Sequence, residues 1–433
     1  MDLWKSVREI EEDVVAYRRH IHENPELSLK EFDTADYVET VLKGIEGVDS
    51  IRRISPTGIL AEVRGTKEGK GRCIALRGDM DALPGDEMAD VPFKSKRPGV
   101  VHSCGHDVHT ALLLGAVRIL ARHRGEFAGT VKFFFQPAEE VLGGAIQFLG
   151  AGALENPKVD AAVGIHVFSD HDAGIISSRK GPMLAGADGL TIEVKGCQSH
   201  AAHPHTGRDA VVIAGQVIGA LQTISSRFVA PTDPVVVTIG QINGGIARNI
   251  IAGSVTLEGT IRTVKPETRD RVHRELEKMV PALAEAMGGS AVVEIQRGTP
   301  PLICDDGLVD RLQAVTEKLL GKDRYVSLPD PSMGGEDFAF IMEKVPGLFI
   351  RLGVKRPGGP VTPGHSVDFF ADESAIAPGL AVFAGTALDF LGVPLDAVET
   401  QIRNFPWQRE CCRAQRQGRE TDRDVGFRRS CHG

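Results

Sequence analysis

The chain has 433 residues, of which 42% are hydrophobic and 25% are charged, and this is the composition of an ordinary globular protein with room for two domains. The formal net charge of −8 argues against nucleic acid as a partner, and the charged N-terminus lacks the apolar core of a signal peptide. Seven scattered cysteines do not form the pattern of a secreted disulfide framework, and the apolar run 111–120 is too short to span a bilayer. We therefore expect a soluble cytoplasmic protein with no membrane partner.

The first half of the chain reads as helix and strand in alternation. Apolar residues at helical spacing predict three helices, and continuous apolar runs predict four strands that are covered on both faces. The helices are expected at residues 5–22, 34–45 and 108–121, and the strands at 58–65, 72–79, 130–136 and 160–167. This pattern predicts an α/β layered domain with a largely parallel or mixed sheet.

The pattern of predicted elements changes near Gly181, after which strands and helices follow in the order β-α-β-β-α-β. The expected elements are a strand at 190–196, a helix at 208–225, strands at 234–242 and 254–263, a helix at 266–287 and a strand at 291–297. This order is the ferredoxin-like split motif. An α/β character then resumes, with a helix at 311–321, a strand at 348–353 and a helix at 373–392. We predict a first domain made of residues 1–182 and 298–396, interrupted by an inserted α+β domain of residues 183–297.

The end of the chain differs from both predicted domains. Residues 401–433 contain eight Arg, no Lys, four acidic residues and three Cys, with almost no aliphatic side chains and no periodicity. Such a segment cannot bury a core. We predict a disordered Arg-rich tail over residues 397–433 with no role in the chemistry; out-of-frame coding sequence is the alternative.

One short stretch, VHSCGHDVHTA at residues 101–111, concentrates side chains that coordinate metals and carry protons. Cys104 and His106 stand at i and i+2, which in an extended segment places both on one face, and a thiolate beside an imidazole is half of a metal site. A plainer interpretation is open for the rest of the stretch. Asp107 would cap the helix that follows, and His109 would be a surface residue in its first turn.

Further polar side chains stand at the carboxyl ends of predicted strands or in the loops that follow. They are Asp79, Asp81, Glu139, Glu140, His166 and His365. This edge is where open α/β sheets bind ligands, and unpaired buried carboxylates are costly, so the set indicates a metal site rather than core packing.

The number of candidate ligands indicates how many ions are bound. The candidates are Cys104, His106, Glu140, His166 and His365. One zinc-like ion needs only three protein ligands and a water, whereas five ligands fit two ions roughly 3.5–4 Å apart that share a bridging water or carboxylate. Glu139 is then free to act as the base that takes a proton from the bridging water.

Six motifs carry a resemblance to a known family. They are LRGDMDALP (76–84), HSCGHDVHTA (102–111), FQPAEE (135–140), SHAAHP (199–204), SMGGEDF (332–338) and GHSVDFFADE (364–373). In this order, between Arg18 and Gly392, the chain resembles the aminoacylase/carboxypeptidase family of two-metal peptidases. It is most similar to the amidohydrolase branch, which includes N-acyl-L-amino acid amidohydrolases, hippurate hydrolases and indole-acetyl-amino acid hydrolases.

The resemblance implies a metallopeptidase-like catalytic domain, an inserted lid and dimerisation domain, and a homodimer or homotetramer that cleaves N-acyl-L-amino acids. It implies two divalent ions per subunit, of Zn, Mn, Co or Ni. The roles it implies are metal ligation by Cys104, His106, Glu140, His166 and His365, general base catalysis by Glu139, and orientation of the site by Asp81. In the lid, His200 and Asn249 would hold the substrate across the dimer, and Arg262 would also bind substrate.

Departures from the family pattern fall beside the ligands rather than on them. Val101 and Ser103 stand where the branch often has Met and Ala, and the segment after His166 lacks a proline that is common there. They bear on the choice of substrate more than on the type of reaction.

Three other functions compete with this interpretation. A dipeptidase or carboxypeptidase of the same family is the nearest. The second is a hydrolase with Cys104 as nucleophile and His106 as base, which leaves the other candidate ligands without a role. A serine nucleophile at Ser366 is not supported, because Asp368 stands where the G-x-S-x-G motif requires glycine. A non-catalytic metal-binding or peptide-binding protein would require loss of the base, yet Glu139 is present.

Overall fold

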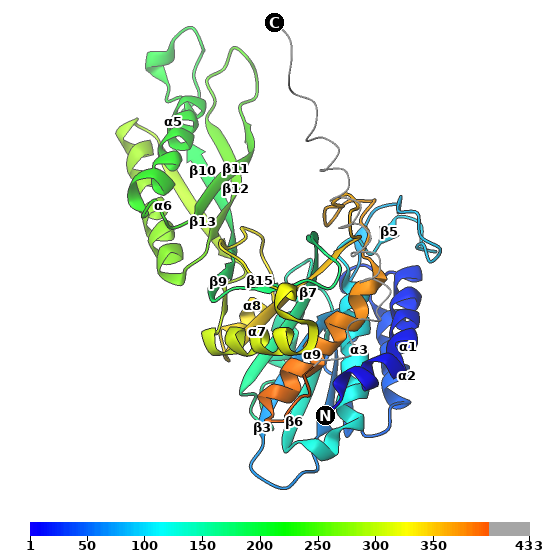
Figure 1. The fold of residues 1–433 in the computed structure, drawn as a ribbon. Helices are drawn as coiled ribbons and strands as arrows, with labels where there is room; N and C mark the ends of the chain where they lie inside the picture. The colour runs from blue at the N-terminus through cyan, green and yellow to red at the C-terminus, as the bar shows by residue number, and fades with distance from the viewer. Residues whose placement is uncertain (398–433) are drawn as a thin grey trace, which may run out of the picture.

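The computed structural model describes residues 1–397, and the predicted tail lies outside the described residues except for its first residue. Figure 1 shows two bodies, a larger one that contains the N-terminus and a smaller one drawn in green. We call them the catalytic body and the lid. The chain passes from the catalytic body into the lid and returns, so the lid is an insertion, as the sequence predicts.

The catalytic body is built on an eight-stranded mixed sheet with the order β1-β2-β6-β3-β7-β16-β8-β15. Its strands are β1 (Ser50–Arg53), β2 (Ile59–Arg64), β3 (Arg72–Asp79), β6 (Gly129–Gln136), β7 (Ala161–Asp172), β8 (Ile176–Ser178), β15 (Tyr325–Ser327) and β16 (Gly347–Lys355). The central strands β6, β3, β7 and β16 run parallel. Strands β3 and β6 are almost wholly buried, as continuous apolar runs predict.

Helices surround this sheet, and α1, α3, α7 and α9 pack against one another in a continuous layer (Figure 1). The helices of the catalytic body are α1 (Leu3–Glu23), α2 (Phe32–Lys43), α3 (His106–Arg122), α4 (Gly144–Gly150), α7 (Asp306–Leu320), α8 (Ala339–Met342) and α9 (Ile376–Phe390). Two small two-stranded antiparallel sheets complete this part, β4 (Leu83–Pro84) with β5 (Val100–Val101) and β9 (Gly181–Leu184) with β14 (Leu302–Cys304). The long helices and strands that the sequence predicts are present. The sequence does not predict the short ones, because they have too few residues to show a hydrophobic period.

The lid is a four-stranded antiparallel sheet with two helices and a hydrophobic core of its own. Its elements are β10 (Gly186–Lys195), α5 (Ala210–Thr223), β11 (Val235–Gly244), β12 (Ser254–Thr263), α6 (Pro266–Ala286) and β13 (Ser290–Arg297). The strand order β11-β12-β10-β13 is that of the ferredoxin-like motif. The predicted fold class, an α/β catalytic domain with an inserted ferredoxin-like lid, is therefore confirmed.

Within residues 1–397, one helical stretch, Ala210–Phe228, is long and apolar enough to cross a membrane by length and composition alone. It comprises α5 and the turn after it. Ile213, Val217 and Leu221 are buried in the core of the lid, and the core helix of a folded domain passes the same test. A single helix of this kind is weak evidence for a membrane span.

A buried carboxylate lies at the end of the lid where the chain enters and leaves it. Asp188 in β10 accepts hydrogen bonds from Arg269 Nε at 2.9 Å, from His273 at 2.7 Å and from the amide of Gly298 at 3.0 Å. These contacts join α6 to the two strands by which the chain enters and leaves the lid. They hold this end of the lid together.

Candidate metal centre

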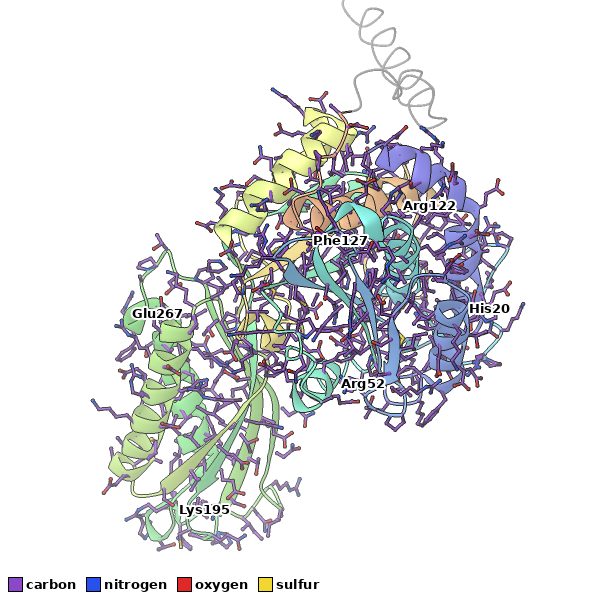
Figure 2. All side chains as sticks on the ribbon, turned by 90° about the horizontal axis from the view of Figure 1, so that it is seen from below. His20, Arg52, Arg122, Phe127, Lys195 and Glu267 are labelled. Atoms are coloured by element: carbon purple, nitrogen blue, oxygen red, sulfur yellow. The ribbon has the colours of Figure 1, made fainter. Side chains whose placement is uncertain are left out.

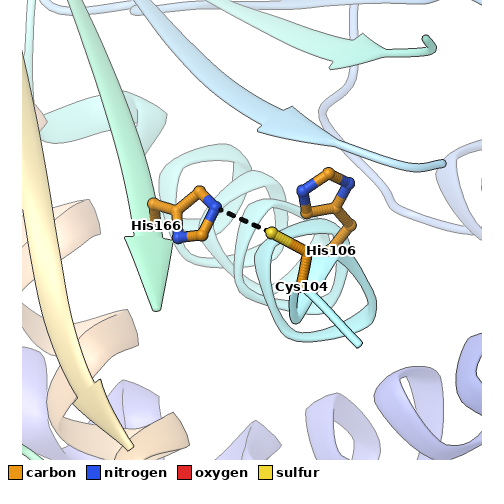
Figure 3. A group of neighbouring side chains, drawn as sticks. All are labelled: Cys104, His106 and His166. Atoms are coloured by element: carbon orange, nitrogen blue, oxygen red, sulfur yellow. Dashed lines mark hydrogen bonds between the residues drawn. The ribbon is translucent and has the colours of Figure 1, made fainter. Parts of the chain in front are cut away.

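Cys104 and His106 converge on one point, but not in the way the sequence predicts. The expected extended segment is wrong, because Gly105 has a left-handed φ of 82° and His106 is the first residue of α3. A Cβ at Gly105 would lie 2.2 Å from Val167, so only glycine fits this turn. The turn brings the donor atoms of Cys104, His106 and His166 within 4.8 Å of one another (Figure 3).

His166 lies in the middle of β7 and not at a strand end, so that expectation is also wrong. The strand continues to Asp172 through polar residues that periodicity does not reveal. The Nδ1 of His166 is 2.7 Å from the carbonyl oxygen of Val167, which can only accept, so Nδ1 carries the proton. The other nitrogen, Nε2, keeps its lone pair and faces the sulfur of Cys104 at 3.4 Å (Figure 3), which is the tautomer a metal ligand requires.

Asp81 fastens the turn that carries the two glutamates. Its carboxylate accepts hydrogen bonds from the amides of Glu139 and Glu140, both at 3.1 Å, and from the hydroxyl of Ser28 at 2.7 Å. It also lies 3.2 Å from the Nδ1 of His106. The carboxylate therefore orients both the imidazole and the FQPAEE turn.

Glu140 and His365 complete the set of donors. The Nε2 of His365 lies 3.4 Å from Oε1 of Glu140, and the same oxygen lies 3.8 Å from Nε2 of His106. Among the described residues, the buried atoms His106 Nε2 and Glu140 Oε1 have no hydrogen-bond partner. Buried polar atoms without a partner are rare, and thiolate, imidazole and carboxylate are zinc-type ligands, so this donor set fits divalent metal ions.

Glu139 is buried beside these donors, and a carboxylate oxygen of Glu139 lies within 4.8 Å of a carboxylate oxygen of Glu140 and of a ring nitrogen of His106. Burial raises its pKa, and the nearby carboxylates Glu336 and Asp337 raise it further. A carboxylate with a raised pKa binds a proton more tightly than an ordinary one. Burial also raises the pKa of the Cys104 thiol, which opposes its use as a free nucleophile.

A buried charged cluster with no predicted role lies beside Glu139. The guanidinium of Arg77, fully buried, lies 2.8 Å from Glu336 and 3.1 Å from Asp337, and it also pairs with Asp79. Burial raises the pKa of Glu336 to about 7 and that of Asp337 to about 6. Asp337 accepts hydrogen bonds from the two amides that begin α4. The SMGGEDF motif marked this segment, but the sequence did not reveal its buried partner.

Two interpretations of the VHSCGHDVHTA stretch are wrong. His109 is fully buried; its Nδ1 lies 2.6 Å from Asp79, and its Nε2 accepts a hydrogen bond from the amide of Val167 at 2.8 Å. Asp107 does not cap α3, because the carboxylate binds Arg18 and His22 of α1 instead. Neither role shows in a local pattern, since the partners come from distant segments.

A cavity of about 570 Å³ opens beside the donors and extends to the lid. Besides Cys104, Glu139, Glu140, His166 and His365, it is lined by Arg262 of β12. Its apolar lining includes Leu142, Phe168, Leu184, Phe349 and Phe369. A chamber of this size accommodates a small organic molecule with apolar and charged ends.

His200 and Asn249 lie away from this cavity. Both are exposed. The loops that carry them are joined by a hydrogen bond from the amide of Ala201 to the carbonyl of Asn249 at 3.1 Å. Lys195, which ends β10 five residues before His200, lies at the end of the lid that points away from the catalytic body (Figure 2). The structure thus brings the five candidate ligands, Glu139, Asp81 and Arg262 together and leaves His200 and Asn249 apart.

Residues 75–389 match the peptidase family M20/M25/M40. The chain belongs to this family. It is 37% identical to an N-acetyl-L-cysteine deacetylase of Bacillus subtilis, over 85% of each chain. It is 36% identical to thermostable carboxypeptidase 2 of Saccharolobus solfataricus, over 90% of this chain and 98% of that one.

A solved structure from the same family is also similar. The YXEP protein of Bacillus subtilis, described as a dinuclear metal binding peptidase of family M20, is 32% identical with a TM-score of 0.78. The match covers 89% of this chain and 100% of that chain. The resemblance to the amidohydrolase branch is confirmed, and the protein is a metal-dependent M20 hydrolase that acts on amide bonds.

Proposed function

We propose that this M20 hydrolase cleaves the amide bond of N-acyl-L-amino acids. The observation that carries the proposal is the placement of Glu139, a buried carboxylate at the wall of a cavity that also presents four of the five proposed metal ligands, an arginine and apolar side chains. A similar chain, the N-acetyl-L-cysteine deacetylase, bears the name of a reaction of this class.

The proposed ligands of two divalent ions, of Zn, Mn, Co or Ni, are the donors already described. They are Cys104, His106, Glu140, His166 and His365. When bound, such ions supply Lewis acidity that polarises a carbonyl group and lowers the pKa of water. The protein prepares the site by fixing the tautomer of His166 and by holding His106 against Asp81.

Glu139 is the proposed general base. Its carboxylate accepts the proton of the attacking water and passes it to the nitrogen of the leaving amine. The raised pKa favours the first transfer, and the cluster of Glu336 and Asp337 behind it sustains that pKa. Asp81 acts on the base only through the backbone, since its carboxylate holds the amide of Glu139.

The side chains that line the cavity support the proposed class of substrate. The guanidinium of Arg262 supplies a positive charge for the free carboxylate of an L-amino acid, while Phe168, Phe369 and Leu142 offer an apolar surface to an acyl group. We also propose that His200 and Asn249 reach the site of a second copy in a homodimer. Both residues are exposed and neither lines the cavity of its own chain, which supports contact with another chain.

Peptide cleavage is the second candidate function. It is favoured by the similarity to thermostable carboxypeptidase 2, and Arg262 is equally suited to the terminal carboxylate of a peptide. The two functions differ in whether the group before the scissile amide is an acyl group without an amine or an amino acid.

The test is a hydrolysis screen of the apoprotein supplied in turn with Mn²⁺, Zn²⁺, Co²⁺ or Ni²⁺. The substrates are N-acetyl, N-benzoyl and indole-acetyl derivatives of amino acids, together with dipeptides that share the same C-terminal residue. The proposal requires faster cleavage of the N-acyl compounds. Preference for the dipeptides would replace it with the second function, and inhibition by iodoacetamide but not by a chelator would favour Cys104 as a nucleophile.

A further inference from the structure

A buried ion cluster joins α1 to the start of α3, one residue beyond the proposed ligand His106. The carboxylate of Asp107 lies 2.7 Å from Arg18 Nε and 2.8 Å from the Nδ1 of His22. The other nitrogen of His22, Nε2, lies 2.9 Å from the carboxylate of Glu87. All four side chains are buried, with exposed fractions of 4% or less. His22 is therefore a bridge between two carboxylates.

Each nitrogen of His22 faces a carboxylate oxygen, so both nitrogens carry protons and the ring is an imidazolium. Burial by itself disfavours this charge, but Asp107 and Glu87 raise the pKa of His22 to about 9. Arg18 also lies 3.2 Å from Glu373, which pairs in turn with Arg19. Arg18 and His22 are therefore left to balance the negative charges of Asp107 and Glu87. Removing His22 leaves one carboxylate without compensation inside the protein.

Each of the two carboxylates is connected to a loop that carries a proposed ligand. Asp107 directly follows His106. Glu87 directly precedes Met88, whose amide donates to the carbonyl of Val367 at 2.7 Å in the loop that carries His365. The same two loops meet directly, because the amide of His365 donates to the carbonyl of Ser103 at 2.7 Å.

His365 depends on such support more than the other ligands do. Its side chain is 59% exposed, and its backbone has a left-handed φ of 65°, which is strained for a residue other than glycine. The other proposed ligands on α3, β7 and the FQPAEE turn are buried or nearly so. A loop with a strained and exposed ligand holds its geometry only when the surrounding contacts fix it.

We propose that His22 is a positioning residue of the metal centre, which bridges Asp107 and Glu87 and thereby fixes the His106 and His365 loops relative to each other. The inference rests on the ligand set of the proposed function. It gives α1, which contributes no ligand, a direct influence on how tightly the ions are held.

The test compares His22→Gln with the matched control His20→Gln. His20 stands on the same helix two residues earlier, but it is exposed and stacks on Tyr37, at 3.8 Å between ring centres. Affinity for Mn²⁺ and for Zn²⁺ is measured by competition with a chelator. The unfolding temperature of each protein is measured with and without the ion.

We expect His22→Gln to weaken ion binding by about 10-fold, at the low end for outer partners of a metal site, and His20→Gln to leave it unchanged. The rise in unfolding temperature on adding the ion should shrink in His22→Gln. A purely structural role would lower the unfolding temperatures of the apo and loaded forms equally and leave affinity within twofold of the wild type. That result overturns the inference while the proposed ligands stand.

A second variant keeps the test valid if His22→Gln does not fold. In the double variant His22→Gln with Glu87→Gln, the remaining charges of Arg18 and Asp107 balance again while the ionic bridge is still absent. It should fold and still bind the ion more weakly than Glu87→Gln alone. Equal affinity of the two would overturn the inference, and a wild-type protein that binds neither ion would overturn the ligand set and the inference with it.

Discussion

In the catalytic body, the residues proposed for chemistry lie among buried charges, whereas the lid residues His200 and Asn249 lie on the surface. The first group is held by side chains from many segments, such as Arg77, Asp81 and Asp337. The second group is held by backbone contacts within one end of the lid. The difference teaches that the catalytic body assembles its site on folding, whereas the lid loops of His200 and Asn249 are left exposed, and the proposed homodimer assigns these exposed loops to contact with a second copy.

The largest effect is expected inside the catalytic body, from Glu139→Gln. The amide keeps the shape of the carboxylate but cannot accept a proton, and loss of a general base costs about 10²–10⁴-fold in rate. Turnover of an N-acyl amino acid should fall by this factor while metal content stays near the wild-type value. A variant that keeps most of its activity would show that Glu139 is not the base.

The contrasting variant in the lid is His200→Ala. If His200 stabilises the carbonyl oxygen in a neighbouring subunit, its loss costs about 3–4 kcal/mol in the transition state. The decisive assay mixes this variant with Glu139→Gln under conditions of subunit exchange. A mixed dimer then contains one intact composite site, and activity should return. Absence of recovery after demonstrated exchange would place His200 outside any shared site.

A smaller loss is expected for Cys104→Ser, because a hydroxyl is a poorer ligand than a thiolate for zinc-type ions. Metal occupancy and activity should fall together, and excess ion should restore part of both. Elemental analysis beside the rate measurement checks this. Full occupancy and full activity in the serine variant would remove Cys104 from the ligand set.

The smallest effect on activity is expected at the junction of the two bodies, for Asp188→Asn. Hydrogen bonds from His273 and Arg269 outweigh burial and hold the pKa of Asp188 well below its ordinary value. Its stabilising contribution is therefore present above the unfolded pKa of about 3.9 and is lost as the pH falls toward the folded pKa.

Breaking this buried pair costs about 3–5 kcal/mol at pH 7. Hydrogen exchange in β10 and β13 should be faster in Asp188→Asn than in the wild type at pH 7, and the free-energy difference should shrink below pH 4. A difference that is the same at both pH values would show that the charge of Asp188 does not stabilise the lid.

The sequence revealed those parts of the site that follow a local pattern. Asp81 and Glu140 stand two and four residues after the ends of apolar strands, so the sequence alone predicts that they meet at one edge of the sheet. His166 was placed at a strand end because the polar residues after it hide the continuation of β7. The partners of Asp107 and Arg77 lie 85 and 259 residues away, and no local period encodes such pairs. Burial of these charges is a property of the assembled fold.

The central claim is that the donors around Glu139 hold two divalent ions and that amide cleavage depends on both. It is tested most directly by titrating metal-free protein with Mn²⁺ or Zn²⁺ while measuring bound ion and hydrolysis of an N-acyl amino acid in the same samples. We predict saturation at two ions per chain, with full activity only after the second ion is bound and complete loss on chelation. Full activity without metal would contradict the account, as would saturation at a single ion.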